Sequence, residues 1–222
     1  MTALTYLPQI ANGVFITMIL MLSSLGMGLL LAVIMTMCSF SDNYLLKKMV
    51  AILVFFVRGT PLLVQIFLIY YGSGQFEWVR NSPFWFILRE PMACAIIAFS
   101  INSACYTTII FQGAIKSVPN SEISACEAMG MPKWLAFRRI IFPRAFRIAL
   151  PAYSNEVVMI LKGTSLASTI TLLDLMGVTQ QLIGQAYSTV GFYLAAGVIY
   201  LFLNMGISGV FRLLYRWGHI PE

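Results

Sequence analysis

Long apolar runs separated by short polar segments make up almost the whole chain. Five of these runs cover about 12–38, 49–72, 92–113, 150–173 and 190–211. Each reaches roughly the 20 residues that a helix needs to cross a bilayer. Strands of membrane β-barrels are shorter and alternate between apolar and polar residues. The pattern therefore predicts an all-α membrane protein with about five transmembrane helices.

Composition supports a lipid environment. Of the 222 residues, 59% are hydrophobic and 10% are charged, whereas soluble domains carry about 25% charged residues. There are too few polar side chains to cover a surface that faces water. Backbone groups in lipid must be paired inside the protein, and helices satisfy that requirement.

Basic residues occur mainly in alternate connections between the runs. One side would hold ten of them: Lys47, Lys48, Lys116, Lys133, Arg138, Arg139, Arg144, Arg147, Arg212 and Arg216. The other side would hold only Arg80 and Arg89. The positive-inside rule then predicts a periplasmic N-terminus and a cytoplasmic C-terminus.

The net charge of +6 comes from basic residues that are spread between the apolar runs and form no single patch, so nucleic-acid binding is not expected. Nor is a cleaved signal peptide, because no basic residue precedes Lys47.

The longest cytoplasmic connection, 116–147, has the pattern of two short helices. The first would carry Glu122 in its first turn, near the positive end of the helix dipole, and would end at Gly130. Pro132 is suited to open the second helix, which should end before Pro143.

Six apolar side chains in this connection favour a docking element over a solvated basic loop. They are Ile123, Met129, Trp134, Leu135, Phe137 and Ile141. An amphipathic helix in the headgroup region is the alternative that these residues leave open.

The same connection resembles the EAA loop of ABC importer permeases. The resemblance rests on Ser124-Ala125-Cys126-Glu127-Ala128-Met129-Gly130, nine further residues, and Ile140-Ile141-Phe142-Pro143. In that family the loop contains a coupling helix that sits in a groove of the ATP-hydrolysing subunit. The resemblance assigns this role to Glu122, Ser124, Ala125, Cys126, Glu127, Ala128, Gly130, Ile140 and Pro143. Ser124 stands where the family has Glu, Cys126 where it has Ala, and Phe142 where it has Leu. The Ser124 departure removes a carboxylate that Glu122 or Glu127 could replace, and the loop would still dock by shape and apolar contact.

Other segments resemble the polar amino-acid branch of these permeases. Arg58-Gly59-Thr60-Pro61-Leu62-Leu63-Val64-Gln65 with Tyr70-Tyr71-Gly72 is similar to the second span, and Asn155-Glu156 with Leu161–Leu166 is similar to the fourth. Residues 153–158 and 171–177 look most like the M-type permeases of bacterial arginine importers. The resemblance implies one ABC transmembrane (type 1) domain over 1–222, in the bacterial inner membrane. It also implies uptake of a polar amino acid, L-arginine before lysine, histidine or glutamine.

The implied partners are a second permease subunit, two ATP-binding cassette subunits, a periplasmic amino-acid-binding protein and membrane lipid. The sequence has no G-x-x-x-x-G-K-[ST] stretch, so ATP with Mg²⁺ is expected on the partner ATPase and no cofactor on this chain.

A metal cluster or catalytic triad is not expected either, because the sequence has a single histidine, His219. The chain is therefore expected to be a transport subunit that works by alternating access, and not an enzyme. The four cysteines are expected to pack as small apolar residues.

Polar residues inside the runs are candidates for a substrate pathway. Asn102 and Tyr106 are four residues apart and would share one helix face. Asn155, Lys162, Thr164 and Ser165 are the candidates in the fourth run, where Gly163–Ser165 could also break the helix. For each of these residues, helix packing is the alternative.

Two further charges in the runs leave the choice between function and structure open. Glu156 either meets a cationic group of the substrate or snorkels at the membrane surface. Arg58, next to an expected kink at Thr60-Pro61, favours a structural role at a helix end or lipid headgroup.

Two function classes compete with an ABC importer. A secondary transporter or channel would need no docking loop and more often has internal repeats. A membrane scaffold would not need polar groups in several spans.

Overall fold

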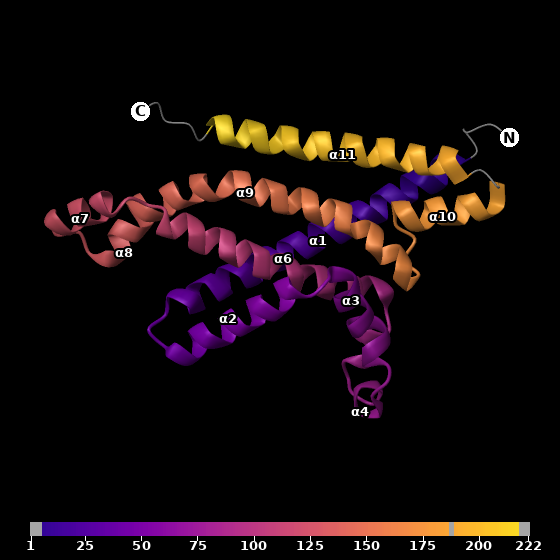
Figure 1. The fold of residues 1–222 in the computed structure, drawn as a ribbon, viewed down its shortest axis with the longest axis horizontal. Helices are drawn as coiled ribbons and strands as arrows, with labels where there is room; N and C mark the ends of the chain where they lie inside the picture. The colour runs from indigo at the N-terminus through magenta and orange to yellow at the C-terminus, as the bar shows by residue number, and fades with distance from the viewer. Residues whose placement is uncertain (1–5, 187–188, 218–222) are drawn as a thin grey trace.

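The computed structural model describes residues 6–186 and 189–217, so His219 lies outside the described residues. All regular structure in the described part is helical (Figure 1). The α-helices are α1 (Leu7–Phe40), α2 (Tyr44–Gly59), α3 (Leu62–Phe67), α4 (Glu77–Arg80), α5 (Trp85–Leu88), α6 (Pro91–Lys116), α7 (Asn120–Ala128), α8 (Lys133–Ala136), α9 (Phe142–Gly163), α10 (Leu175–Ala186) and α11 (Thr189–Trp217). Two π-helical segments, η2 (Leu68–Gly72) and η3 (Phe137–Ile141), and one 3₁₀ segment, η4 (Thr164–Ile170), continue α3, α8 and α9.

Three of the predicted spans are single long helices. α1, α6 and α11 are long and apolar enough to cross a bilayer, and they contain the predicted runs 12–38, 92–113 and 190–211. Two bent helix pairs raise the number of candidate spans to five. The all-α membrane class predicted from the sequence is confirmed.

The second predicted span, over about 49–72, is a bent pair of helices. The expected kink is present at Thr60, but α2 and the α3–η2 helix meet there at 105°. Pro61 disfavours helical geometry at the preceding residue, and Thr60 is extended, with φ −114° and ψ 143°. α2 therefore ends as a helix of its own, and the chain turns away from its axis (Figure 1).

The sequence predicted that the second loop helix ends before Pro143, and this prediction is wrong. It continues through η3 into α9, so the helical path runs from Lys133 to Ile170. The missing N–H of Pro143 is tolerated because η3 has already changed the hydrogen-bond register, with the Phe142 N–H donating to the Phe137 carbonyl. At the far end, the expected break at Gly163–Ser165 is the change from α9 to η4.

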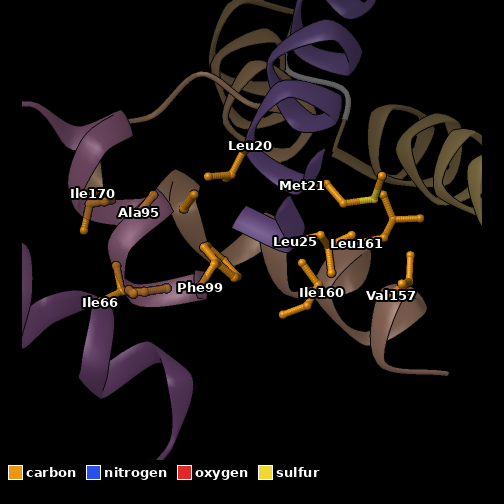
Figure 2. Packing of buried hydrophobic residues seen from close by; sticks show 12 residues of the cluster. Leu20, Met21, Leu25, Ile66, Ala95, Phe99, Val157, Ile160, Leu161 and Ile170 are labelled. Carbon is orange, nitrogen blue, oxygen red and sulfur yellow. The ribbon is translucent and has the colours of Figure 1, made fainter. Parts of the chain in front are cut away.

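α6 forms the centre of the bundle, with α1, α9 and the α2–α3 region packed around it (Figure 1). Gly28 of α1 lets this helix approach α6 closely, because a Cβ at that position would lie 3.1 Å from the Ser100 carbonyl oxygen. The main apolar cluster includes Leu20, Phe99 and Leu161, which are fully buried (Figure 2). By contrast, α2 and α11 expose many large apolar side chains, as expected of faces that contact lipid or another membrane subunit.

The connections fall at two ends of the bundle (Figure 1). α7, α8 and the turn between α1 and α2 lie at one end, and α10 lies at the other, near the start of α1. This arrangement places Lys47, Lys116 and the basic residues of 133–147 at one end of the molecule. The direction in which this end faces across the membrane stays a prediction of the charge pattern.

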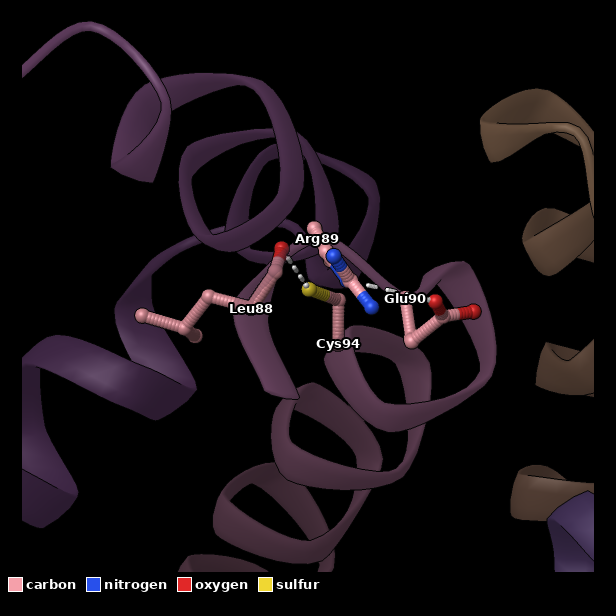
Figure 3. Close-up of polar contacts among 4 residues, drawn as sticks. All are labelled: Leu88, Arg89, Glu90 and Cys94. Atoms are coloured by element: carbon pink, nitrogen blue, oxygen red, sulfur yellow. Dashed lines mark hydrogen bonds and ion pairs between the residues drawn. The ribbon is translucent and has the colours of Figure 1, made fainter. Parts of the chain in front are cut away.

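Short helices α4 and α5 fill the connection before α6. The Cys94 thiol donates a hydrogen bond to the Leu88 carbonyl at 3.1 Å, and Arg89 Nε lies 3.6 Å from Glu90 Oε1 (Figure 3). These contacts fix the turn into α6. Trp78 in this connection is 74% exposed, as a residue in an interfacial aromatic belt would be. The packing interpretation of the cysteines holds for Cys94, Cys105 and Cys126, which are buried free thiols, and Cys38 is half-buried.

Asp174 ties the loop before α10 to α11. The side chain is fully buried and accepts hydrogen bonds from the Gly177 N–H at 2.9 Å and the Met176 N–H at 3.3 Å. The Tyr200 hydroxyl on α11 donates a third bond at 3.3 Å. Thr17 of α1 accepts the Leu175 N–H at 3.0 Å. One cluster of polar contacts thereby links three helices at this end of the bundle.

Candidate coupling loop and translocation site

A glycine turn separates α7 from α8, as the sequence predicted. Gly130 has φ +69°, a left-handed conformation that favours glycine. The Gly130 N–H donates to the Glu127 carbonyl at 2.9 Å, and the Met131 N–H donates to the Cys126 carbonyl at 3.0 Å. This pair of bonds is a Schellman motif, which satisfies carbonyls at the end of α7. The direction in which α8 leaves α7 therefore depends on the backbone of Gly130.

One face of α7 is exposed and consists of small side chains. Ser121, Ser124, Ala125 and Ala128 are exposed at spacings of three and four residues. Cys126, on the opposite side of the helix, is only 3% exposed. Side chains of this size let another surface approach the backbone of α7 closely.

The two acidic residues of α7 have different surroundings. Arg144 Nη2 lies 3.2 Å from Glu122 Oε1, so Glu122 is paired within the chain. Glu127 is exposed and makes no ion pair within 4.0 Å among the described residues. Glu127 is thus the better placed of the two to replace the carboxylate that Ser124 lacks.

A small apolar cluster fixes the coupling loop to the bundle. Val118, after α6, is buried with Ala114 and with Ala145 and Ala149 of α9. Ile140 is half-buried within η3 and Pro143 is exposed at the start of α9. Motion of the loop would therefore be passed to the ends of α6 and α9.

Two of the predicted pathway residues share a face of α6, as their four-residue spacing indicated. Asn102 Nδ2 donates to Gln65 Oε1 at 3.0 Å, and the guanidinium carbon of Arg58 lies 5.0 Å from the centre of the Tyr106 ring. Gln65 Nε2 in turn donates to the Val57 carbonyl at 2.7 Å and to the Thr60 carbonyl at 3.1 Å. Asn102 and Tyr106 therefore face the break between α2 and α3.

The other predicted pathway residues are not brought to this place. Asn155 is exposed and lines a cavity of about 420 Å³ between α9 and α11, while Lys162 is exposed. Thr164 is buried and donates to the Leu161 carbonyl at 2.6 Å, and Ser165 donates to the Lys162 carbonyl at 2.8 Å. Both hydroxyls satisfy the backbone where α9 becomes η4.

Sequence reasoning left Glu156 undecided between a substrate contact and snorkelling, and favoured a structural role for Arg58. Glu156 is 8% exposed and faces Ser103 of α6, so snorkelling at the membrane surface is wrong for this carboxyl group. Arg58 lines a cavity of about 630 Å³. The indication available in the sequence was that an ionisable residue inside a span usually faces a cavity or a partner.

Buried hydroxyl groups on α1 and α6 add to the polar interior. Ser24, Ser100, Ser103 and Thr107 are buried without a hydrogen-bond partner among the described residues. Unpaired polar groups are costly in a bundle that sits in lipid. One of these hydroxyl groups, that of Ser103, faces Glu156 of α9.

Comparison with known proteins decides the family. Residues 28–217 match the family model described as "Binding-protein-dependent transport system inner membrane component". The chain belongs to this family of ABC importer permeases. The permease is 44% identical to a nopaline transport system permease of Agrobacterium fabrum, over 95% of its own length and 88% of that protein. It is 41% identical to an arginine ABC transporter permease of Haemophilus influenzae, over 95% and 91% of the two chains.

Solved structures agree with this assignment. The permease matches a chain from "Crystal structure of an amino acid ABC transporter with histidines" with a TM-score of 0.87 and 27% identity, over 97% of this chain and 99% of that one. It also shares the fold of a chain from the MetNI methionine ABC transporter, with a TM-score of 0.79 and 15% identity, over 99% and 100%.

Membership of this family settles the class of function. The permease is a multi-pass transport subunit of the inner membrane, and it belongs to an amino-acid ABC importer. ATP is hydrolysed by a separate subunit, so the permease itself is not an enzyme. The secondary-transporter and channel alternatives are not favoured.

Proposed function

We propose that the permease imports arginine or a closely similar guanidinium amino acid by alternating access. The relatives named for arginine, nopaline and octopine are 41–50% identical to this chain. The observation that carries the proposal is the α7–Gly130–α8 turn, which projects from one end of the bundle (Figure 1). The complex would contain this chain, a second permease, two ATPase subunits that bind ATP with Mg²⁺, and a periplasmic binding protein. The N-terminus would face the periplasm.

Coupling would act through α7 and the helix that follows it. The small exposed face of α7, with Ser124, Ala125 and Ala128, would fit a groove of the ATPase. Glu122, Cys126, Gly130, Ile140 and Pro143 would hold the shape of the loop, and Glu127 would face the partner. Because α8, η3 and α9 form one continuous helical path, movement at the loop would reach the membrane interior without passing through a flexible joint.

The substrate would pass along the polar face of α6. Asn102 and Tyr106 meet the break between α2 and α3 there. Thr164 and Ser165 would shape the break between α9 and η4. The exposed Asn155 and Lys162 would meet the pathway only from the side of a second permease chain.

Transport assays test this proposal. The permease, reconstituted in proteoliposomes with its partner subunits, is expected to take up labelled arginine only when ATP is present on the ATPase side. Labelled lysine, histidine and glutamine serve as competitors for the substrate. Arginine uptake that continues without the ATPase would contradict the proposed mechanism, and preference for glutamine would contradict the proposed substrate.

A further inference from the structure

A cavity of about 630 Å³ opens between α1, α2 and α6. Its basic residues are Lys47 at the start of α2, Arg58 near the end of α2, and Lys116 at the end of α6. Apolar side chains of α2, among them Val54 and Phe55, line the rest together with Ser39, Tyr106 and Gln112. The cavity therefore lies between the consecutive helices α1 and α2 and the more distant α6.

The cavity extends from one end of the bundle towards its middle. Lys47 and Lys116 lie at the end that also carries α7 and α8 (Figure 1). Arg58 lies eleven residues after Lys47 on the same helix, which corresponds to about 16 Å along the helix axis. A bilayer core is about 30 Å thick, so a helix that crossed it upright from Lys47 would carry Arg58 to about half of that depth. A guanidinium at such a depth requires water, a partner or a ligand.

The lining of the cavity carries positive charge and no negative charge. No Asp or Glu lines the cavity, and among the described residues the two ion pairs within 4.0 Å are Arg89–Glu90 and Arg144–Glu122. The buried Glu156 acts on Arg58 only through space. Three cations that face one partly enclosed space attract an anion.

Arg58 is in contact with Tyr106 of α6. Its guanidinium carbon lies over the Tyr106 ring, 5.0 Å from the ring centre, a cation–π contact that leaves the guanidinium N–H groups able to donate elsewhere. A guanidinium can bind both oxygens of a carboxylate at once. Gly59, which follows Arg58, leaves the space beside it open.

We propose that this cavity is the cytoplasmic half of the translocation pathway, and that Arg58 binds the α-carboxylate of the amino acid there. This inference rests on the proposed function for the identity of the substrate and for the membrane orientation. Lys47 and Lys116 at the rim would draw the carboxylate towards the cytoplasm and keep the guanidinium end of the substrate away from the rim.

The charge of the cavity can be measured without transport. Ala51, which lines the cavity, is replaced by cysteine in a permease without its native cysteines, and the full complex is treated with anionic and cationic thiol reagents of equal size. The anionic reagent should react faster, and Arg58→Gln should lower the ratio of the two rates by about fivefold to tenfold. Lys48→Gln is the matched control, because Lys48 lies over the Tyr44 ring, 5.8 Å from its centre, and does not line the cavity. A ratio that Arg58→Gln and Lys48→Gln change equally would overturn the proposed anion site.

Protection experiments test the ligand. Arginine added on the ATPase side should slow labelling at position 51, whereas agmatine, which lacks the carboxylate, should not. Arg58→Gln should remove the protection by arginine, and Lys48→Gln should keep it. Equal protection by agmatine, or protection that survives Arg58→Gln, would overturn the carboxylate assignment.

Two additional measurements keep the inference separate from the proposed function. If Arg58→Gln does not assemble into the complex, Lys47→Gln at the exposed rim replaces it and should lower the rate ratio in the same direction. Uptake of labelled arginine is measured in the same vesicles. Failed uptake with an intact charge ratio would overturn the proposed substrate and leave the anion site standing. Normal uptake with no charge preference would overturn the anion site alone.

Discussion

Replacing Gly130 by valine is expected to abolish substrate-stimulated ATP hydrolysis by the reconstituted complex while the permease still inserts into the membrane. Gly130 has φ +69°, which costs an L-residue roughly 1–2 kcal/mol, and β-branching raises the cost further. The turn would relax to a negative φ and lose the bond from the Met131 N–H to the Cys126 carbonyl. α8 would then leave α7 in another direction, and the small face of α7 would no longer meet the ATPase. ATP hydrolysis with and without substrate measures the effect.

Gly130→Asn is the matched control, because asparagine tolerates the left-handed conformation and a Cβ at this position meets nothing within 4 Å. This variant should keep most of the stimulation. Equal loss in both variants would show that the space around Gly130, and not its backbone conformation, decides coupling. Full activity of Gly130→Val would contradict the role of the turn.

Asp174→Ala is expected to lower the stability of the permease by about 3 kcal/mol or more, because several buried donors lose their acceptor together. The donors are the Gly177 and Met176 N–H groups and the Tyr200 hydroxyl. The connection between α10 and α11 would loosen first. Thermal unfolding of the purified permease in mild detergent, followed by circular dichroism or light scattering, measures the change.

Asp42→Ala makes the same substitution at an exposed residue in the turn between α1 and α2, and it should change stability by less than about 0.5 kcal/mol. Asp174→Asn keeps one acceptor oxygen and should fall between the two. Unfolding temperatures that are the same for Asp174→Ala and Asp42→Ala would show that the buried cluster does not hold this end of the bundle together.

The features that the sequence predicted correctly depend on local physics. Runs of about 20 apolar residues specify α1, α6 and α11 whatever surrounds them. The turn at Gly130 follows from glycine at a helix end and proline two residues later. The shared face of Asn102 and Tyr106 follows from helix periodicity alone.

The features that the sequence did not give correctly depend on contacts between distant residues. Gln65 donates hydrogen bonds to the Val57 and Thr60 carbonyls and accepts one from the Asn102 side chain. These side chains support the 105° bend, and no local sequence pattern reveals that they pair. The register change in η3 carries the helix past Pro143, although proline usually ends a helix. Glu156 is buried where α9 packs on α6, and its position in the sequence, near one end of the predicted run 150–173, does not show this.

The position of α7 relative to the membrane tests the central claim most directly. Ser124, on the exposed face of α7, is replaced by cysteine in a permease without native cysteines, and a membrane-impermeant thiol reagent is added to oriented vesicles. Labelling is predicted in inside-out vesicles only, and added ATPase subunit should protect the thiol. Labelling in right-side-out vesicles would place the loop in the periplasm, out of reach of any cytoplasmic ATPase, and would contradict the account.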